Sequence, residues 1–154
     1  MKQIVNYIKE GLKVNSKSKI KEFTYNYFPE TGFELQKIVQ KCIDERGNEA
    51  DLNDIDTSKV TNMNGLFMNL RFNGDISKWD VSNVKSMASM FLNSRFNGDI
   101  SDWNVSNVED MYCMFYRSSF NRNISKWDVS KVKDMSNMFK NCPLEKNTPK
   151  WYKK

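Results

Sequence analysis

The sequence contains no histidine, and this excludes the chemistry that most often depends on an imidazole group. A Ser-His or Cys-His nucleophile pair cannot form, and the commonest zinc sites are excluded as well. Neither a G-x-x-x-x-G-K-[ST] nor a G-x-G-x-x-G stretch occurs, so no glycine-rich loop of these kinds could hold a nucleotide phosphate. An enzyme would have to use carboxylates, lysine or tyrosine alone. We therefore expect a non-catalytic protein with no cofactor and no metal.

Cysteines and long apolar runs are also scarce. Cys42, Cys113 and Cys142 include no C-x-x-C pair, which predicts free thiols in a reducing compartment. The N-terminus lacks the unbroken apolar stretch of a secretory signal, and no segment is long and apolar enough to predict a transmembrane helix. We expect a cytoplasmic chain with no membrane partner. If the chain is phage-encoded, the host cytoplasm or the virion is the expected location.

The positive charges lie at the two ends of the chain, whose total formal charge is +5. Residues 1–21 hold six lysines and one glutamate, a net charge of +5, and residues 140–154 hold five lysines and one glutamate, a net charge of +4. The total then leaves −4 for residues 22–139. An acidic body repels a nucleic-acid backbone, so we expect no nucleic-acid partner.

The most informative feature present is a period of 24 residues, which four separate columns share. The columns are Trp79, Trp103, Trp127 and Trp151; Phe67, Phe91, Phe115 and Phe139; Met63, Met87, Met111 and Met135; and Val60, Val84, Val108 and Val132. A fixed period of this length is typical of a solenoid, in which stacked repeats bury a common core. It favours binding over catalysis and does not identify the partner.

Within one repeat the spacing predicts a strand followed by a helix. Trp79 and Val81 lie two residues apart, as on one side of a short strand. Val84, Met87 and Phe91 follow at i, i+3 and i+7, the spacing of one face of a helix. The predicted fold class is α/β, a short right-handed solenoid of the leucine-rich-repeat type with about four strand–helix repeats.

Residues 1–50 break the period and are predicted to form an N-terminal cap of helix, strand and helix. The first helix is expected near residues 4–12, and the strand near residues 23–27, where aromatic side chains alternate. Thr31 and Glu34 have the spacing of a capping box, the apolar stripe behind them predicts a helix, and Gly47 ends it. Residues 51–154 then form the repeat solenoid, with a closing strand around Lys150-Trp151 and a basic tail.

Two outward columns of polar residues are the candidate partner-binding site. They are Asp56, Asp80, Asn104 and Asp128, and beside them Asp54, Lys78, Asp102 and Lys126. In one interpretation the carboxylates bond local backbone or serine hydroxyls, and lysines neutralise the ladder. In the other, the exposed face binds a basic or mixed-charge partner. A divalent-ion site would need more carboxylates than one residue per repeat supplies.

The repeat Phe-Asn-Gly-Asp-Ile-Ser-Lys-Trp-Asp-Val-Ser-Asn-Val, followed by Met and Met-Phe, resembles the BspA-like leucine-rich repeat family, also known from mycoplasma surface lipoproteins. The resemblance covers residues 51–142. The lead-in from Glu34-Leu35 to Asp51–Asp56 is similar to the family's approach to its first repeat. The resemblance implies a solenoid used for protein contact or adhesion. Residues 1–12 are similar to the amphipathic leader of internal head proteins of some tailed phages.

We therefore expect a protein-interaction module that binds a protein partner through the exposed solenoid face. One alternative is a phage particle component, packaged with residues 1–20 as a processed leader. Another alternative is a surface adhesin. The expected oligomeric state is a monomer, or a weak dimer through the C-terminal edge, where an open last repeat invites pairing.

Overall fold

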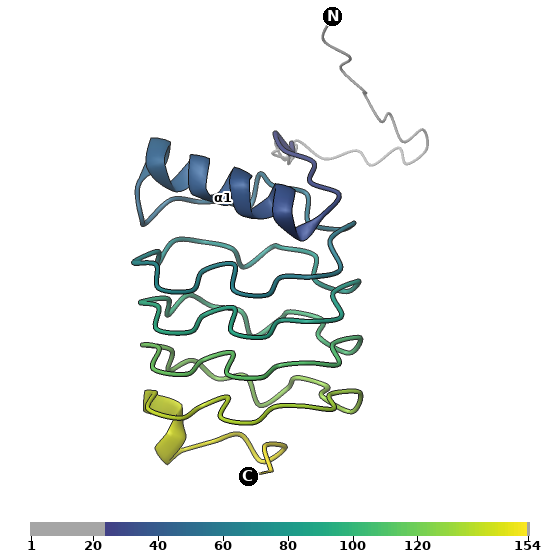
Figure 1. Ribbon diagram of the computed structural model, residues 1–154, viewed down its shortest axis with the longest axis vertical. Coiled ribbons are helices and arrows are strands. Elements are labelled where there is room, and N and C mark those ends of the chain that lie inside the picture. The colour runs from purple at the N-terminus through teal and green to yellow at the C-terminus, as the bar shows by residue number, and fades with distance from the viewer. Residues whose placement is uncertain (1–23, 154) are drawn as a thin grey trace, which may run out of the picture.

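The computed structural model describes residues 24–153, and they form a stack of similar loops with a helix across one end (Figure 1). We call each loop of 24 residues a coil: coil 1 is 52–75, coil 2 is 76–99, coil 3 is 100–123 and coil 4 is 124–147. The repeat solenoid predicted from the period is confirmed. The helix expected near residues 4–12 lies outside the described residues.

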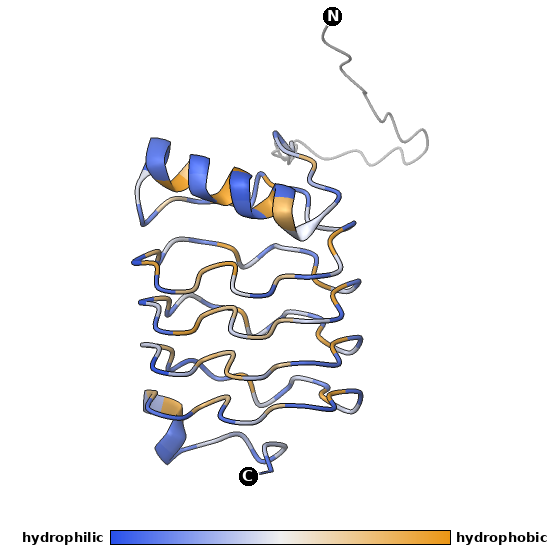
Figure 2. Cartoon of the chain, viewed as in Figure 1, coloured by the Kyte–Doolittle hydropathy of each residue, from blue (hydrophilic) through white to orange (hydrophobic). Residues whose placement is uncertain are grey.

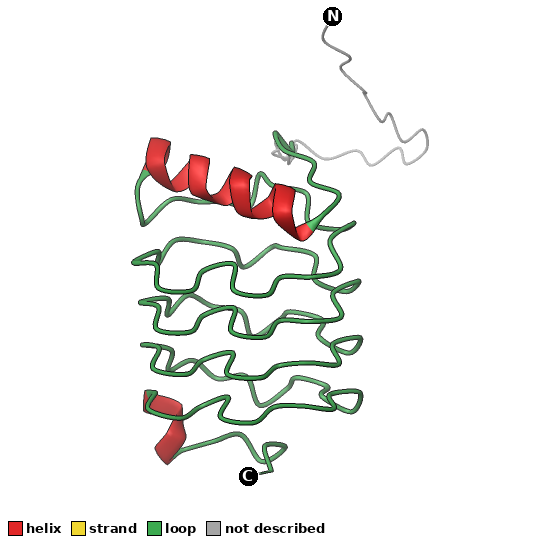
Figure 3. Cartoon of the chain, in the orientation of Figure 1, coloured by secondary structure: helices red, strands yellow, loops and turns green. Residues whose placement is uncertain are grey.

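The prediction of strand–helix repeats is wrong. Within residues 24–153 the structure contains the α-helix α1 (Gly32–Arg46), the short 3-10 helix η1 (Pro143–Lys146) and no β-strand (Figure 3). Strands were also expected near residues 23–27 and at Lys150-Trp151, and none is present at the described residues 24–27 or 150–151. Tyr27 instead makes a single parallel bridge to Ile55, and Trp151 lies in a turn.

Consecutive tight turns replace the predicted helix of each repeat. In coil 2 the Met90 N–H donates to the Met87 carbonyl, and the Ser94 N–H donates to that of Phe91. The third residue of each turn has a positive φ, 57° at Ser89 and 52° at Asn93, as a type II turn requires. Asn69, Asn93 and Asn141 hold this conformation in three coils, and asparagine tolerates it better than most residues.

The turns leave their remaining backbone groups pointing along the stack, where they join one coil to the next. Met63, Gly65, Phe67 and Asn69 donate their N–H groups to the carbonyls of Ser86, Ala88, Met90 and Leu92, each at 2.9 Å. The same four bonds join coils 2 and 3, and then coils 3 and 4, at 2.8–3.0 Å. This segment therefore satisfies its backbone between coils rather than within a helix.

The core lies inside the stack, because each coil buries the same apolar columns. Rings of the Phe67 column stack almost parallel, with centroids 5.5, 5.5 and 5.9 Å apart in successive coils. The Trp103 indole is 4% exposed, and its Nε1–H donates to the carbonyl of Ile76 in the preceding coil at 3.2 Å. The other three tryptophans make the equivalent bond.

Helix α1 begins and ends where the sequence predicts. Its first turn is capped by the Thr31 hydroxyl, which accepts from the Glu34 N–H at 3.2 Å, and Gly47 follows its last residue with a φ of 87°. Leu35, Val39 and Cys42 are buried. Figure 2 shows apolar and polar residues alternating along α1, as in an amphipathic helix. The helix thus replaces a missing coil at this end of the stack.

Coil 4 departs from the pattern of the other coils at Pro143. Arg95 and Ser119, the equivalent residues of coils 2 and 3, each donate an N–H to the preceding coil. Proline has no N–H, so this bond cannot form in coil 4. The chain turns through η1 and crosses back, where Trp151 stacks on Trp127 at 6.5 Å.

Candidate functional site

The first polar column is held in place by short local turns. An Oδ1 atom of Asp56, Asp80, Asn104 and Asp128 accepts from the backbone N–H two residues later, at 3.0, 2.9, 3.3 and 3.0 Å. This Asx-turn is a structural role for every member of the column. Hydrogen bonds from Ser130, through its hydroxyl and its N–H, lower the pKa of Asp128, which keeps that carboxylate charged at neutral pH.

The column retains capacity for a partner. A carboxylate has two acceptor oxygens, and the Oδ2 atoms of Asp56, Asp80 and Asp128 make no hydrogen bond within the described residues. The side chains of Asp80 and Asp128 are exposed, and Asp56 is half-buried. The local turn and partner binding are therefore compatible roles, because the turn fixes the side chain and uses only one of its oxygens.

The second column divides into two parts. Asp54 accepts from the Arg46 guanidinium at 2.9 and 3.0 Å and from the Asn26 amide at 2.8 Å. The bond from Arg46 is the main reason that the pKa of Asp54 lies below its usual value. Asp54 thus attaches α1 to coil 1, and its carboxylate is already engaged in that contact.

The rest of the second column, Lys78, Asp102 and Lys126, is exposed. Asp102 and Lys126 form no side-chain hydrogen bond or ion pair with any residue of 24–153. The interpretation in which lysines neutralise the ladder therefore has no direct ion pair behind it at these two residues. Both charges are available to a molecule that binds from outside.

An exposed aromatic pair lies beside the first column, and the sequence reasoning missed it. Tyr25 and Phe28 are 40% and 66% exposed, with their ring centroids 6.4 Å apart in an edge-to-face arrangement. The Asn26 N–H donates to the Asp54 carbonyl and the Asp56 N–H donates to the Tyr27 carbonyl, so the segment that carries the pair runs beside Asp56. Burial, and then the charges of Asp56 and Asp80, raise the pKa of the Tyr25 phenol. The available signal was the aromatic cluster itself, which we had read only as an alternating strand.

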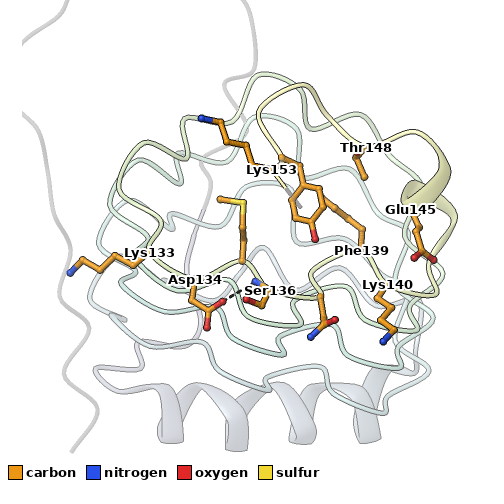
Figure 4. A pocket seen from close by; sticks show the side chains of 11 residues that line it. Lys133, Asp134, Ser136, Phe139, Lys140, Glu145, Thr148 and Lys153 are labelled. Carbon is orange, nitrogen blue, oxygen red and sulfur yellow. Dashed lines mark hydrogen bonds between the residues drawn. The ribbon is translucent and has the colours of Figure 1, made fainter.

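Surface hollows lie at both ends of the stack. One of about 310 Å³ lies between the start of α1 and coil 1, lined by Gly32, Phe33 and Asn62 among others. The other, of about 530 Å³, lies between the turns of coil 4 and the returning chain (Figure 4). Lys133, Lys140 and Lys153 are at its rim, together with Asp134 and Glu145. No group of three or more cysteine or acidic side chains within residues 24–153 could hold a metal ion.

The repeated coils, their shared core and the inter-coil bonds define a repeat solenoid. A family model described as "Mycoplasma protein of unknown function, DUF285" matches residues 33–151, which include most of the chain. The chain belongs to this family. Comparisons with curated proteins and with solved structures gave no match. Among residues 24–153, neither helix is long and apolar enough to cross a membrane.

Proposed function

We propose that the chain is a non-catalytic module that binds a protein partner through the first polar column and the adjacent aromatic pair. The observation that carries this proposal is that Asp56 and Asp80 each keep an unused oxygen, while the segment with exposed Tyr25 and Phe28 is bonded through its backbone to residues 54–56. Aromatic side chains next to fixed charges are typical of the residues that dominate binding energy at protein interfaces.

The partner that fits this surface carries basic or mixed charge and an apolar side chain. Carboxylates held by Asx-turns lose little conformational freedom on binding, so a lysine or arginine of the partner meets a preorganised acceptor. Asp102 and Lys126 add one charge of each sign farther along the stack. The resemblance of residues 51–142 to BspA-like leucine-rich repeats, with a right-handed solenoid used for protein contact, supports the same reading.

The experiment uses substitutions that remove charge and keep the fold. Asp80→Asn with Asp128→Asn retains the Oδ1 acceptor of both turns, and Asn104 shows that asparagine makes the same contact in this column. Phe28→Ala tests the aromatic pair separately. Asp110→Asn is the matched control, since Asn62 occupies the equivalent position in coil 1 and makes the same turn.

Full-length chain and variants serve as baits in quantitative affinity purification from lysate of the source organism. We expect a protein that is recovered with the wild type and with Asp110→Asn, and at least about fivefold less with each of the other two variants. Equal recovery with all four baits would show that this surface is not the binding site. Loss with Asp110→Asn alone would place the site on the turn face, by which we mean the side of the stack formed by the tight turns of residues 63–70 and the equivalent residues of the later coils.

A further inference from the structure

The hydrogen bonds between the turn segments all point the same way. In each case an N–H of the earlier coil donates to a carbonyl of the later coil, four times at each of the three junctions. Peptide dipoles that lie in parallel add, so the N–H end of such a row is electropositive, as it is in an α-helix. On this face of the stack the positive end is coil 4. Bonds elsewhere, such as Lys85 N–H to the Thr61 carbonyl, run in the opposite direction, which confines the effect to the turn face.

Coil 4 has no coil after it, and its donors are left over. Met135, Asn137, Phe139 and Asn141 occupy the positions of Met111, Cys113, Phe115 and Arg117, which all donate to the next coil. The N–H groups of Met135, Asn137 and Phe139 have no hydrogen-bond partner within residues 24–153. All three residues line the hollow of about 530 Å³.

The fourth donor of this row shows what kind of group completes it. The N–H of Asn141 donates to the carboxylate of Glu145, Oε2, at 2.8 Å. A carboxylate is thus bound at the end of the same row, on the side of the hollow where Figure 4 shows Glu145 and Lys140. A row of parallel backbone N–H groups without acceptors favours a group rich in acceptor oxygens, such as a carboxylate.

The lining of the hollow carries charges of both signs. Lys140 and Lys153 have no ion pair within the described residues, whereas Lys133 pairs with Glu109. The two acidic side chains of the lining are already engaged, because Asp134 accepts from the Ser136 N–H and Glu145 from that of Asn141. Both carboxylates keep their negative charge, because a neutral N–H donor does not cancel it, so the selection for acceptors rests on the free N–H groups, and Lys140 and Lys153 add only local attraction.

A second copy of the chain does not fit this edge. Two copies related by a two-fold axis would bring donors against donors, because the carbonyls of Met135, Asn137 and Phe139 are already used in turns. The head-to-tail alternative needs the coil 1 end of another copy, and α1 covers that end. A methyl group at Gly32 would lie 2.2 Å from the Asn62 carbonyl oxygen, and Arg46 holds the other end of α1 to Asp54.

We propose that the hollow at the coil 4 end binds an extended acidic segment of a partner protein, whose carboxylates and carbonyls accept from Met135, Asn137 and Phe139. This surface is separate from the polar column of the proposed function, and either can exist without the other. It resembles strand addition to a sheet edge, except that this edge supplies only donors and so selects for a segment rich in acceptors.

The test uses fluorescein-labelled decaglutamate as the probe and decaglutamine as the matched neutral peptide. Binding is followed by fluorescence anisotropy, and amide exchange by NMR reports on individual residues. In the free protein the amides of Met135, Asn137 and Phe139 should exchange rapidly, and those of Met111 and Phe115 slowly. We expect saturating decaglutamate to slow the three free amides at least about tenfold.

Single substitutions separate this site from general attraction to a basic protein. Lys140→Gln and Lys153→Gln should each weaken decaglutamate binding about threefold, in keeping with rim charges. Lys85→Gln, an exposed lysine of coil 2, and the Asp80→Asn, Asp128→Asn double variant should bind as the wild type does. These results would support the acidic-segment site whatever the outcome for the polar column.

Several results would overturn the proposal of an acidic-segment site. The amides could stay unprotected at about 1 mM decaglutamate, the affinity range of a single weak contact. Decaglutamine could protect them equally, which would remove the requirement for acidic side chains. Protection of the free protein that rises with its own concentration would assign the edge to a dimer. If the three amides are protected in the free protein, and deletion of residues 1–23 removes that protection, the hollow would be assigned to the chain's own N-terminal segment.

Discussion

Replacing Trp103 tests whether the coils unfold as one stacked core. The indole is 4% exposed, and coils lie on both sides of it. Trp103→Ala removes a large buried ring and leaves a cavity, for which we expect a loss of about 3–5 kcal/mol in the free energy of unfolding. The bond from Nε1 to the Ile76 carbonyl contributes less, since that oxygen also accepts from the Trp79 N–H at 3.2 Å.

Trp151 provides the comparison within the same chain. It makes the equivalent Nε1 bond, to the Ile124 carbonyl at 3.1 Å, but its side chain is only half-buried and no coil follows it. Trp151→Ala should therefore cost about 1–2 kcal/mol. Trp103→Phe keeps most of the ring and removes the N–H, so we expect an intermediate loss of about 1–2 kcal/mol from the hydrogen bond and the smaller ring.

The assay is equilibrium unfolding in urea, followed by the fluorescence of the remaining tryptophans and by near-ultraviolet circular dichroism. Coincident transitions with an unchanged m value would show that the coils unfold together, which is required for comparing the losses. Equal losses for Trp103→Ala and Trp151→Ala would refute the reasoning, because a stacked core makes the inner position worth more. A reduced m value for Trp103→Ala would show instead that the stack divides at coil 3.

Three further predictions concern the turns, the carboxylates and the thiols. Gly65→Ala should lower the unfolding free energy by about 1 kcal/mol, and Ser89→Gly should raise it by up to about 1 kcal/mol, because both positions have positive φ; equal effects in urea titrations would contradict this. The pKa of Asp54 is lowered mainly by Arg46, so the stability that this ion pair contributes is present above the unfolded-state pKa near 4 and is lost as the pH falls through the lower folded-state pKa. Asp54→Asn should therefore flatten the fall in melting temperature below about pH 4. An unchanged acid profile would show that the pair adds no stability. Burial raises the pKa of the Cys142 thiol, so its reaction with a disulfide reagent at pH 7 should be slow until the protein is denatured, and rapid labelling of native protein would contradict its buried position.

The 24-residue period and the core could be predicted from the sequence because each apolar column repeats the same type of buried residue at a fixed interval. Trp103 and Phe91 were expected to lie inside the stack, and both are buried. The local conformation could not be predicted in the same way. The spacing of Val84, Met87 and Phe91 fits a helical face, but consecutive four-residue turns bury the same positions. The signal that distinguishes them was Asn69 and Asn93, which recur where a positive φ is needed.

The polar columns were found, but the role of their members was only partly identified. From the sequence, Ser82 lies just before the predicted helix of its repeat and would be expected to cap it, with its hydroxyl as the acceptor. In the structure its N–H donates to Asp80, so the aspartate is the acceptor. The direction of the bonds between coils has no sequence signature, since every residue but proline carries both a donor and an acceptor. The unused donors of coil 4 therefore became visible only with coordinates.

The inter-coil bonds have a consequence for how this chain can change its length. The Met63 N–H donates to the Ser86 carbonyl, and the Met87 N–H donates to the Asp110 carbonyl, one repeat later. The contact between one coil and the next is therefore the same at each of these junctions. Duplication or loss of 24 residues by recombination between repeats preserves every contact, and helix α1 and the terminal turn need not change. An insertion of any other size would shift all later tryptophans out of line. Selection can therefore lengthen the protein in whole units, extending the lateral surface while both ends stay the same.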